Sequence, residues 1–186
     1  MAVERARPRA RARVCVRALA MIAALGMVAT PMTSASAHGH DRGSALLQCQ
    51  GTESVTYSPG VTFGARQFDV TTDGRFVSCL DAGGKVRSGS YGEKFSLFAG
   101  CDDLLDGFTA RRTFRWSTGD TSVAEISGSS TEVAGQVVTT ITGKVVEGRF
   151  KGHGAVEVIT LPQPGVLQCL TTGFTGATGV TTLTIA

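Results

Sequence analysis

The chain has 186 residues, of which 42% are hydrophobic and 18% charged, and this composition excludes an intrinsically disordered protein. The formal net charge is +3, but residues 1–37 hold six arginines and one glutamate, so the remainder has 12 basic against 14 acidic side chains. That balance excludes a polybasic protein that binds nucleic acid. The remainder is long enough for one domain with a hydrophobic core and too short for two.

The first 37 residues have the parts of a secretory signal peptide. Arginines from Arg5 to Arg17 form a positive region, and the apolar stretch 18–30 that follows is too short to span a bilayer. Ala35-Ser36-Ala37 then fits a signal peptidase site. We therefore expect residues 1–37 to be cleaved and the product to be secreted, extracellular and free of the membrane.

Residues 38–47 are predicted to form a flexible tail that begins with His38-Gly39-His40. A free amine, two backbone amides and the His40 imidazole would offer four nitrogens in a plane, which suits Cu(II) or Ni(II). Alternatively, the amine and ring of His38 together with His153 would form a copper histidine brace, the arrangement of lytic polysaccharide monooxygenases, which the chain does not otherwise resemble. A third interpretation is a frayed tail whose histidines have no function. Copper is the one cofactor that these residues suggest.

Residues 48–186 are predicted to form a single all-β domain. Helical periodicity is absent, threonine and valine are frequent, and turn residues recur at Ser58-Pro59-Gly60, Asp73-Gly74, Gly83-Gly84, 117–120 and 162–165. This spacing favours an antiparallel two-sheet β-sandwich, with a small β-barrel as the alternative. The expected strands are 53–57, 61–70, 75–80, 85–99, 108–116, 122–127, 136–142, 149–160, 166–172 and 180–185.

The core is predicted from alternation along these strands. In the strand 108–116, Arg112 shares the apolar face with Phe114 and Trp116, so we expect either a bulge that turns it away or an ion pair with a carboxylate at the edge of the core. The predicted core residues are Val55, Tyr57, Phe63, Phe68, Phe76, Val77, Phe95, Leu97, Phe114, Trp116, Val137, Ile141, Phe150, Val156, Val158 and Leu183.

Three aspartates, Asp102, Asp103 and Asp106, lie close together before Gly107. Their carboxylates could bind Ca²⁺, but the spacing is not that of the twelve-residue calcium loop. The alternative is a solvated acidic turn between two strands.

Four cysteines follow the leader: Cys49, Cys79, Cys101 and Cys169. An even number in a secreted domain predicts two disulfides, with three possible pairings. We favour Cys79–Cys101, which are close in sequence, and Cys49–Cys169, because Leu47-Gln48-Cys49 recurs as Leu167-Gln168-Cys169 and suggests two neighbouring strands. No Cys-x-x-Cys motif or nearby histidine supports a zinc site.

The stretch Cys49-Gln50-Gly51-Thr52-Glu53-Ser54-Val55-Thr56-Tyr57-Ser58-Pro59-Gly60 resembles a group of small exported actinobacterial proteins of unknown function. The segment 138–152 is similar to their Thr-Gly-x-Val-x-x-Gly-x-Phe-x-Gly stretch. The resemblance implies secretion, β-structure and paired cysteines. It implies no activity.

The sequence carries no convergent catalytic residues: it has no Gly-x-Ser-x-Gly motif, and His153 is the only histidine beyond the tail. We therefore expect a non-enzymatic binding or interaction module, with an extracellular protein or a carbohydrate as its partner. Two alternatives are a copper-dependent oxidative enzyme that uses His38, and a small protease inhibitor that presents the loop 161–165.

Overall fold

A computed structural model describes residues 46–103 and 106–186 of the chain. The predicted signal peptide, His38 and His40 lie outside these residues. The predicted tail ends too late at 47, because Leu47 is fully buried and begins the first strand.

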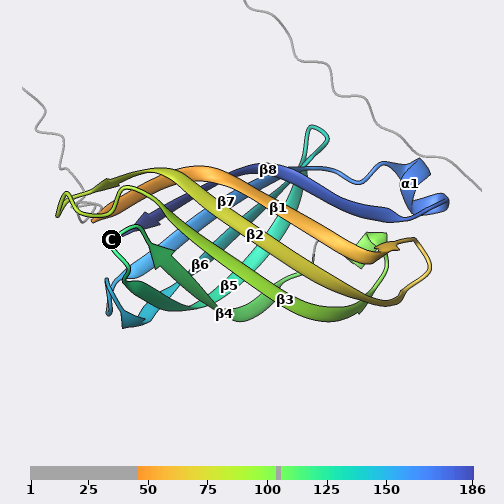
Figure 1. Cartoon of the computed structure of the whole chain (residues 1–186). Helices are drawn as coiled ribbons and strands as arrows, with labels where there is room; N and C mark the ends of the chain where they lie inside the picture. The colour runs from red at the N-terminus through yellow and green to blue at the C-terminus, as the bar shows by residue number, and fades with distance from the viewer. Residues whose placement is uncertain (1–45, 104–105) are drawn as a thin grey trace, which may run out of the picture. The chain divides into compact units, whose positions relative to one another are not determined.

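Eight antiparallel strands follow one another in chain order around a closed barrel (Figure 1). Each strand pairs with the next, and the last pairs with the first. The all-β prediction is thus confirmed, in the form of the barrel rather than the sandwich. The strands are β1 (Leu47–Val61), β2 (Arg66–Asp81), β3 (Gly89–Ala99), β4 (Phe108–Trp116), β5 (Thr121–Val133), β6 (Gln136–Gly148), β7 (Gly154–Pro162) and β8 (Phe174–Ile185), with the 3-10 turn η1 (Cys101–Asp103) and the helix α1 (Val166–Leu170) between strands.

Glycines mark several of the turns, as the sequence predicted. Gly84 and Gly119 adopt positive φ in the β2–β3 and β4–β5 connections, where a residue with a β-carbon would be strained. Asp73-Gly74, in contrast, is not a turn but lies inside β2. A β-carbon at Gly74 would lie 2.0 Å from the Tyr91 ring, so this glycine makes room for an aromatic side chain in the core. Ser58-Pro59-Gly60 likewise lies within β1.

The predicted strand 166–172 is wrong, because its first part forms α1. The Gln168 side chain accepts a hydrogen bond from the backbone N–H of Gly165 at 3.1 Å, which satisfies a donor at the start of the helix. Leu167-Gln168-Cys169 is therefore helical, and the expected pair of neighbouring strands with Leu47-Gln48-Cys49 does not form.

The interior contains two hydrophobic clusters. One fills the end of the barrel near the β2–β3 and β4–β5 connections, hereafter the closed end, and includes the rings of Phe76, Tyr91, Phe114 and Trp116. The other, smaller cluster consists of Val55, Val61, Phe68 and Val70 and lies toward the end that carries α1, hereafter the open end. Of the predicted core residues, five are instead exposed to 40–73%: Phe63, Val77, Phe95, Leu97 and Val156.

Three of these errors have a structural reason. In β7 the buried face consists of Ala155, Glu157 and Ile159. Because this face carries a charged residue, the sequence pattern favoured the opposite face, and Val156 was wrongly placed in the core. In β3, Phe95 and Leu97 do share the inner face with Tyr91, but the barrel is incomplete beside them. β3 pairs with β2 along its length, yet it pairs with β4 only at Gly89 and Ser90.

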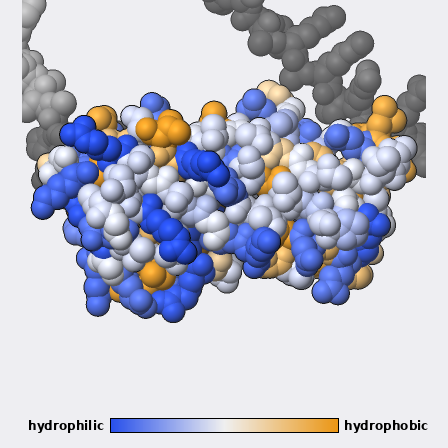
Figure 2. All heavy atoms as spheres, in the orientation of Figure 1, coloured by the Kyte–Doolittle hydropathy of each residue, from blue (hydrophilic) through white to orange (hydrophobic). Residues whose placement is uncertain are grey.

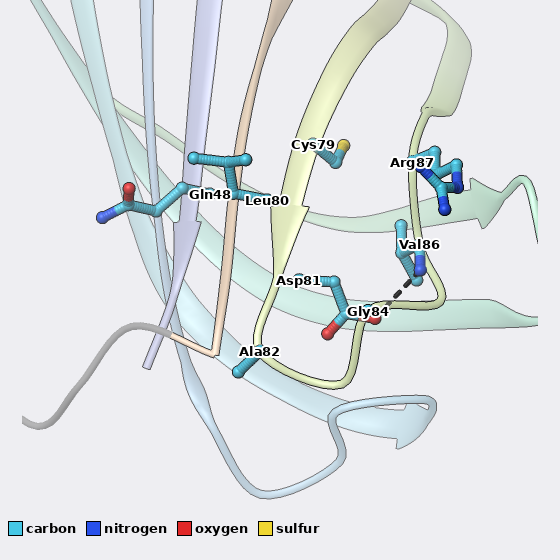
Figure 3. A pocket seen from close by; sticks show the side chains of 8 residues that line it. All are labelled: Gln48, Cys79, Leu80, Asp81, Ala82, Gly84, Val86 and Arg87. Atoms are coloured by element: carbon cyan, nitrogen blue, oxygen red, sulfur yellow. Dashed lines mark hydrogen bonds between the residues drawn. The ribbon is translucent and has the colours of Figure 1, made fainter.

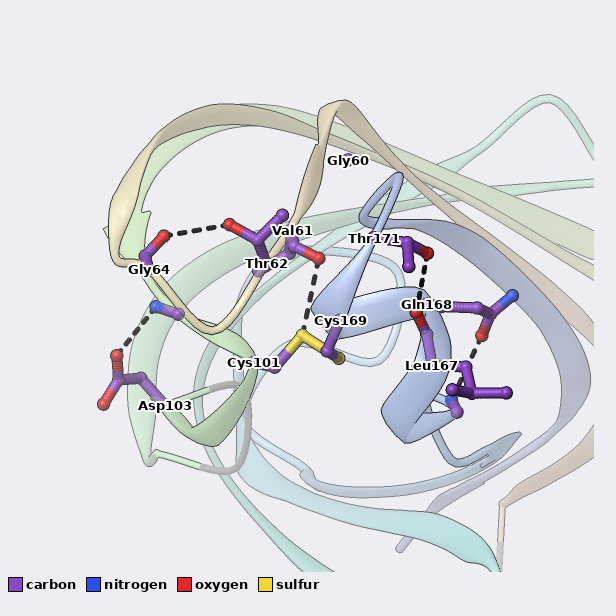
Figure 4. The surroundings of a disulfide bond; sticks show 12 residues. Gly60, Val61, Thr62, Gly64, Cys101, Asp103, Leu167, Gln168, Cys169 and Thr171 are labelled. Carbon is purple, nitrogen blue, oxygen red and sulfur yellow. Dashed lines mark hydrogen bonds between the residues drawn. A yellow bond between two sulfur atoms is a disulfide. The ribbon is translucent and has the colours of Figure 1, made fainter.

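The four cysteines that follow the leader all form disulfides, but the pairing that we favoured is wrong. Cys49 pairs with Cys79, its direct neighbour across β1 and β2. Cys101 of η1 pairs with Cys169 of α1 at the open end (Figure 4). Local sequence separation was a poor guide because strand pairing, rather than chain distance, brings cysteines together.

Within residues 46–103 and 106–186, none of the helices is long and apolar enough to cross a membrane. The face of the barrel in Figure 2 is mostly hydrophilic, with small hydrophobic patches.

Candidate functional site

A belt of polar side chains crosses the lumen, flanked by apolar core residues. At its centre Arg112 donates two hydrogen bonds to Glu93, at 2.9 and 3.0 Å, and one to Glu157 at 2.5 Å. Thr181 donates to the second oxygen of Glu157 at 3.0 Å, and the Arg112 guanidinium lies 4.3 Å from the centre of the Tyr91 ring. The predicted ion pair of Arg112 is thus confirmed, with two carboxylates rather than one.

Glu53 completes the belt from β1. It is 4% exposed and accepts a hydrogen bond from the Tyr91 hydroxyl at 2.5 Å. Burial raises the pKa of Glu53 above its usual 4.5, although the Tyr91 hydrogen bond and the Arg112 charge act in the opposite direction. The raised pKa favours the neutral form of Glu53, in a belt that holds three carboxylates and one guanidinium.

The charge of Arg112 is fixed by the same contacts. Burial lowers the pKa of its guanidinium, but the Glu93 hydrogen bonds and the attraction of Glu157 outweigh that effect and raise it. Burial also raises the pKa of the Tyr91 hydroxyl, so the phenol remains a neutral donor. The belt is therefore a satisfied network that joins β1, β3, β4, β7 and β8, and its role is structural.

Beyond the belt, the open end of the barrel holds a cavity of about 320 Å³. Tyr57, Leu161 and Ala177 line this cavity and also pack on the small hydrophobic cluster. Four lining side chains are polar, namely Asp102, Glu132, Thr139 and Gln163, and the others are apolar or aromatic. The hollow thus exposes polar and apolar surface in similar amounts, and two of its polar groups are carboxylates.

The aromatic wall of the cavity is held in place by ring contacts. The Tyr57 ring lies 5.7 Å from Phe68, edge to face, and 5.5 Å from Phe174, measured between centroids. Burial raises the pKa of the Tyr57 hydroxyl to about 12, and the nearby Glu53 adds to this. The phenol is therefore neutral at physiological pH and presents an uncharged surface to the cavity.

The Cys101–Cys169 disulfide fixes the two segments that cover the open end. Both cysteines line the cavity, and Figure 4 shows the disulfide between η1 and α1. The backbone N–H of Cys101 donates to Thr62 at 2.9 Å, and Phe63 N–H donates to Cys169 at 3.2 Å. The cavity is thus preformed by covalent and backbone contacts rather than by loose loops.

A second hollow lies beside the β2–β3 connection and includes Gln48, Cys79 and Asp81 (Figure 3). Asp81 accepts three backbone hydrogen bonds at 2.9 to 3.0 Å, from Gly83, Lys85 and Val86. These bonds, above all that from Val86, lower the pKa of the carboxyl group. Asp81 therefore orders this loop, and the hollow has a structural explanation.

The remaining predicted site residues are spread over the molecule. His153 is exposed in the β6–β7 turn at the closed end. The cavity lies at the opposite end of the barrel. Asp102, Asp103 and Asp106 are exposed; Asp102 lines the cavity and Asp103 accepts the Gly100 N–H at 2.8 Å. Across the described ranges, no three His, Cys, Asp or Glu residues gather to hold a metal ion.

Sequence reasoning missed Glu53, Glu93 and Glu157, although a usable signal was present. Glu53 shares its alternating face with Val55 and Tyr57, just as Arg112 shares one with Phe114. Three carboxylates on apolar faces and one arginine on another are the components of a buried network.

A scan of family models, a search of curated proteins and a search of solved structures each found no match to this chain. The features of the chain that bear on function are its cavity, its polar belt and its strand edges.

Proposed function

We propose that this chain is a secreted, non-enzymatic binding module that holds a small molecule with both apolar and polar groups in the open half of its lumen. The observation that supports this most strongly is the preformed cavity of about 320 Å³, walled by Tyr57, Leu161 and Phe174. Two disulfides and the predicted signal peptide suit a protein that works outside the cell.

The loop that we considered as an inhibitory loop supports this proposal instead. Leu161, Pro162, Gln163 and Pro164 all line the cavity, so they contribute to its wall. The prediction of a copper enzyme depends on His38, outside the described residues, and remains a prediction.

Binding of the neutral fluorescent probe N-phenyl-1-naphthylamine tests the proposal. Ala177→Phe would fill the cavity, whereas Thr178→Phe places the same ring on the outer face of the same strand, where Thr178 is exposed. We expect saturable one-to-one binding by the wild type and by Thr178→Phe, and its loss in Ala177→Phe. Absence of saturable binding, or equal binding by both variants, would contradict the proposal.

A further inference from the structure

The seam between β3 and β4 is open along most of its length. β3 pairs with β2 from Gly89 to Ala99 and β4 pairs with β5 from Phe108 to Arg115, but the two strands pair with each other only at Gly89↔Trp116 and Ser90↔Arg115. No turn or loop of the described residues supplies a backbone partner to residues 91–99 or 108–115. Each strand thus has one free edge, and such edges are templates for pairing with another chain.

Backbone alternation shows which groups of β3 face this gap. Ser117 N–H donates to Ser88 at 3.0 Å on the β4 side, whereas Cys79 N–H donates to Arg87 at 2.9 Å on the β2 side. Along an antiparallel strand these directions alternate, so the even-numbered residues of β3 present their N–H and C=O groups to the gap. Ser96 is among them.

The side chains beside the gap specify what would fit. Phe95, Leu97 and Phe108 are 44%, 42% and 40% exposed, although Phe95 and Leu97 lie on the inner face of β3. The outward positions of both strands carry three cations, Lys94, Arg111 and Arg115, and no carboxylate. Lys94 forms no ion pair with any described residue, whereas Arg111 pairs with Glu147 at 2.7 Å. Arg115 lies at the paired end of the seam, opposite Ser90.

We propose that this gap is a docking site for an extended segment of another polypeptide, which adds as a strand to the free edge of β3. The inward side chains of this segment are apolar, to cover Phe95 and Leu97, and its outward side chains are acidic or neutral, to match Lys94. This mode of recognition draws affinity from main-chain hydrogen bonds and specificity from alternate side chains.

Two other occupants fit less well. Residues 38–45 contain only one apolar residue, Ala45, and cannot cover the exposed rings. A second copy would have to bring an edge strand that is already part of a barrel, and β4 stands opposite β3 as an obstacle. A single extended chain brings no second barrel to the seam.

The test is a selection of displayed random ten-residue peptides on the secreted protein, with Ser96→Pro and Ser96→Ala as matched variants. Proline removes an N–H that faces the gap and has no partner in the described protein, whereas alanine keeps it; both lose the exposed hydrogen bond from Ser96 to Asp69. We expect selected peptides to alternate apolar with acidic or neutral residues. Their affinity should fall roughly tenfold or more in Ser96→Pro and stay unchanged in Ser96→Ala. Lys94→Glu should also weaken them, while Lys151→Glu in the β6–β7 turn should not.

Three results would overturn the proposal: no peptide enriched over the Ser96→Pro protein, selected peptides that bind Ser96→Pro as well as wild type, or a wild-type dimer that Ser96→Pro converts to a monomer. The last result would assign the gap to a second copy. Near-ultraviolet circular dichroism and retained N-phenyl-1-naphthylamine binding show that Ser96→Pro is folded. If wild type itself does not bind that probe, the circular dichroism spectrum alone serves as the folding control, so the two proposals can fail separately.

Discussion

Arg112 on β4 and Glu157 on β7 form an ion pair across the lumen, with Nη1 and Oε2 2.5 Å apart and exposed side-chain fractions of 3% and 2%. The two strands are not neighbours in the sheet. The pair therefore connects opposite walls of the barrel, and Glu93 extends it to β3, beside the open seam.

Replacing Arg112 with methionine should be strongly destabilising. The substitution leaves Glu93 and Glu157 without their cation in the lumen, a loss of about 3–5 kcal/mol in the free energy of unfolding. The matched control is Arg111→Met, whose side chain is 57% exposed and which should lose only about 0–1 kcal/mol. Urea denaturation measures both, and an Arg112→Met protein as stable as the Arg111→Met protein would contradict the structural role of the belt.

Glu53→Gln should change how stability depends on pH. Because the folded pKa of Glu53 is raised above 4.5, wild type loses stability as the pH rises from about 4.5 through that folded pKa. Glutamine keeps an acceptor for Tyr91 but cannot ionise. We therefore expect the variant to gain stability relative to wild type between pH 4 and pH 7.5 in a series of urea titrations. Parallel curves for the two proteins would show that burial does not raise the Glu53 pKa.

The two disulfides should have similar effects on stability but different effects on binding. They close loops of 30 and 68 residues, and the chain-entropy model assigns roughly 4 kcal/mol to each. Only Cys101–Cys169 lines the cavity, so Cys101→Ser/Cys169→Ser should weaken binding of N-phenyl-1-naphthylamine, while Cys49→Ser/Cys79→Ser should not. Peptide mapping of the oxidised protein checks the pairing first; a Cys49–Cys169 peptide would refute it.

Gly74→Ala should destabilise the closed end. A methyl group there would lie 2.0 Å from Cζ of Tyr91, and moving that ring disturbs its hydrogen bond to Glu53, at a cost of about 1–3 kcal/mol. Gly92→Ala in β3 is the control, since its methyl group would meet only the Thr72 carbonyl, at 3.4 Å. Thermal unfolding distinguishes them, and equal melting temperatures would mean that Tyr91 does not need the space at Gly74.

The fold class could be predicted from the sequence because alternation and turn residues are local signals. Arg112 was identified in the same way, as a charge on an apolar face. Closure into a barrel was not decided, because sandwiches and barrels share the same strand pattern and differ only in whether the last strand meets the first.

The cavity could not be predicted, because it is formed by segments distant in sequence. Val166 to Leu170 is apolar and β-like in composition, and only Gly165 and Gln168 indicate a helix. The exposure of Phe95 and Leu97 depends on the missing partner of β3, which no pattern within that strand reveals.

The most direct test of the central claim, that a ligand occupies the open half of the lumen, is an amide NMR titration with N-phenyl-1-naphthylamine. We predict saturable shift changes at Tyr57, Leu161 and Ala177, which line the cavity, and none at Tyr91 or the Trp116 indole, which do not. Changes centred on Tyr91 and Trp116, or no saturable change at the open end, would contradict the account.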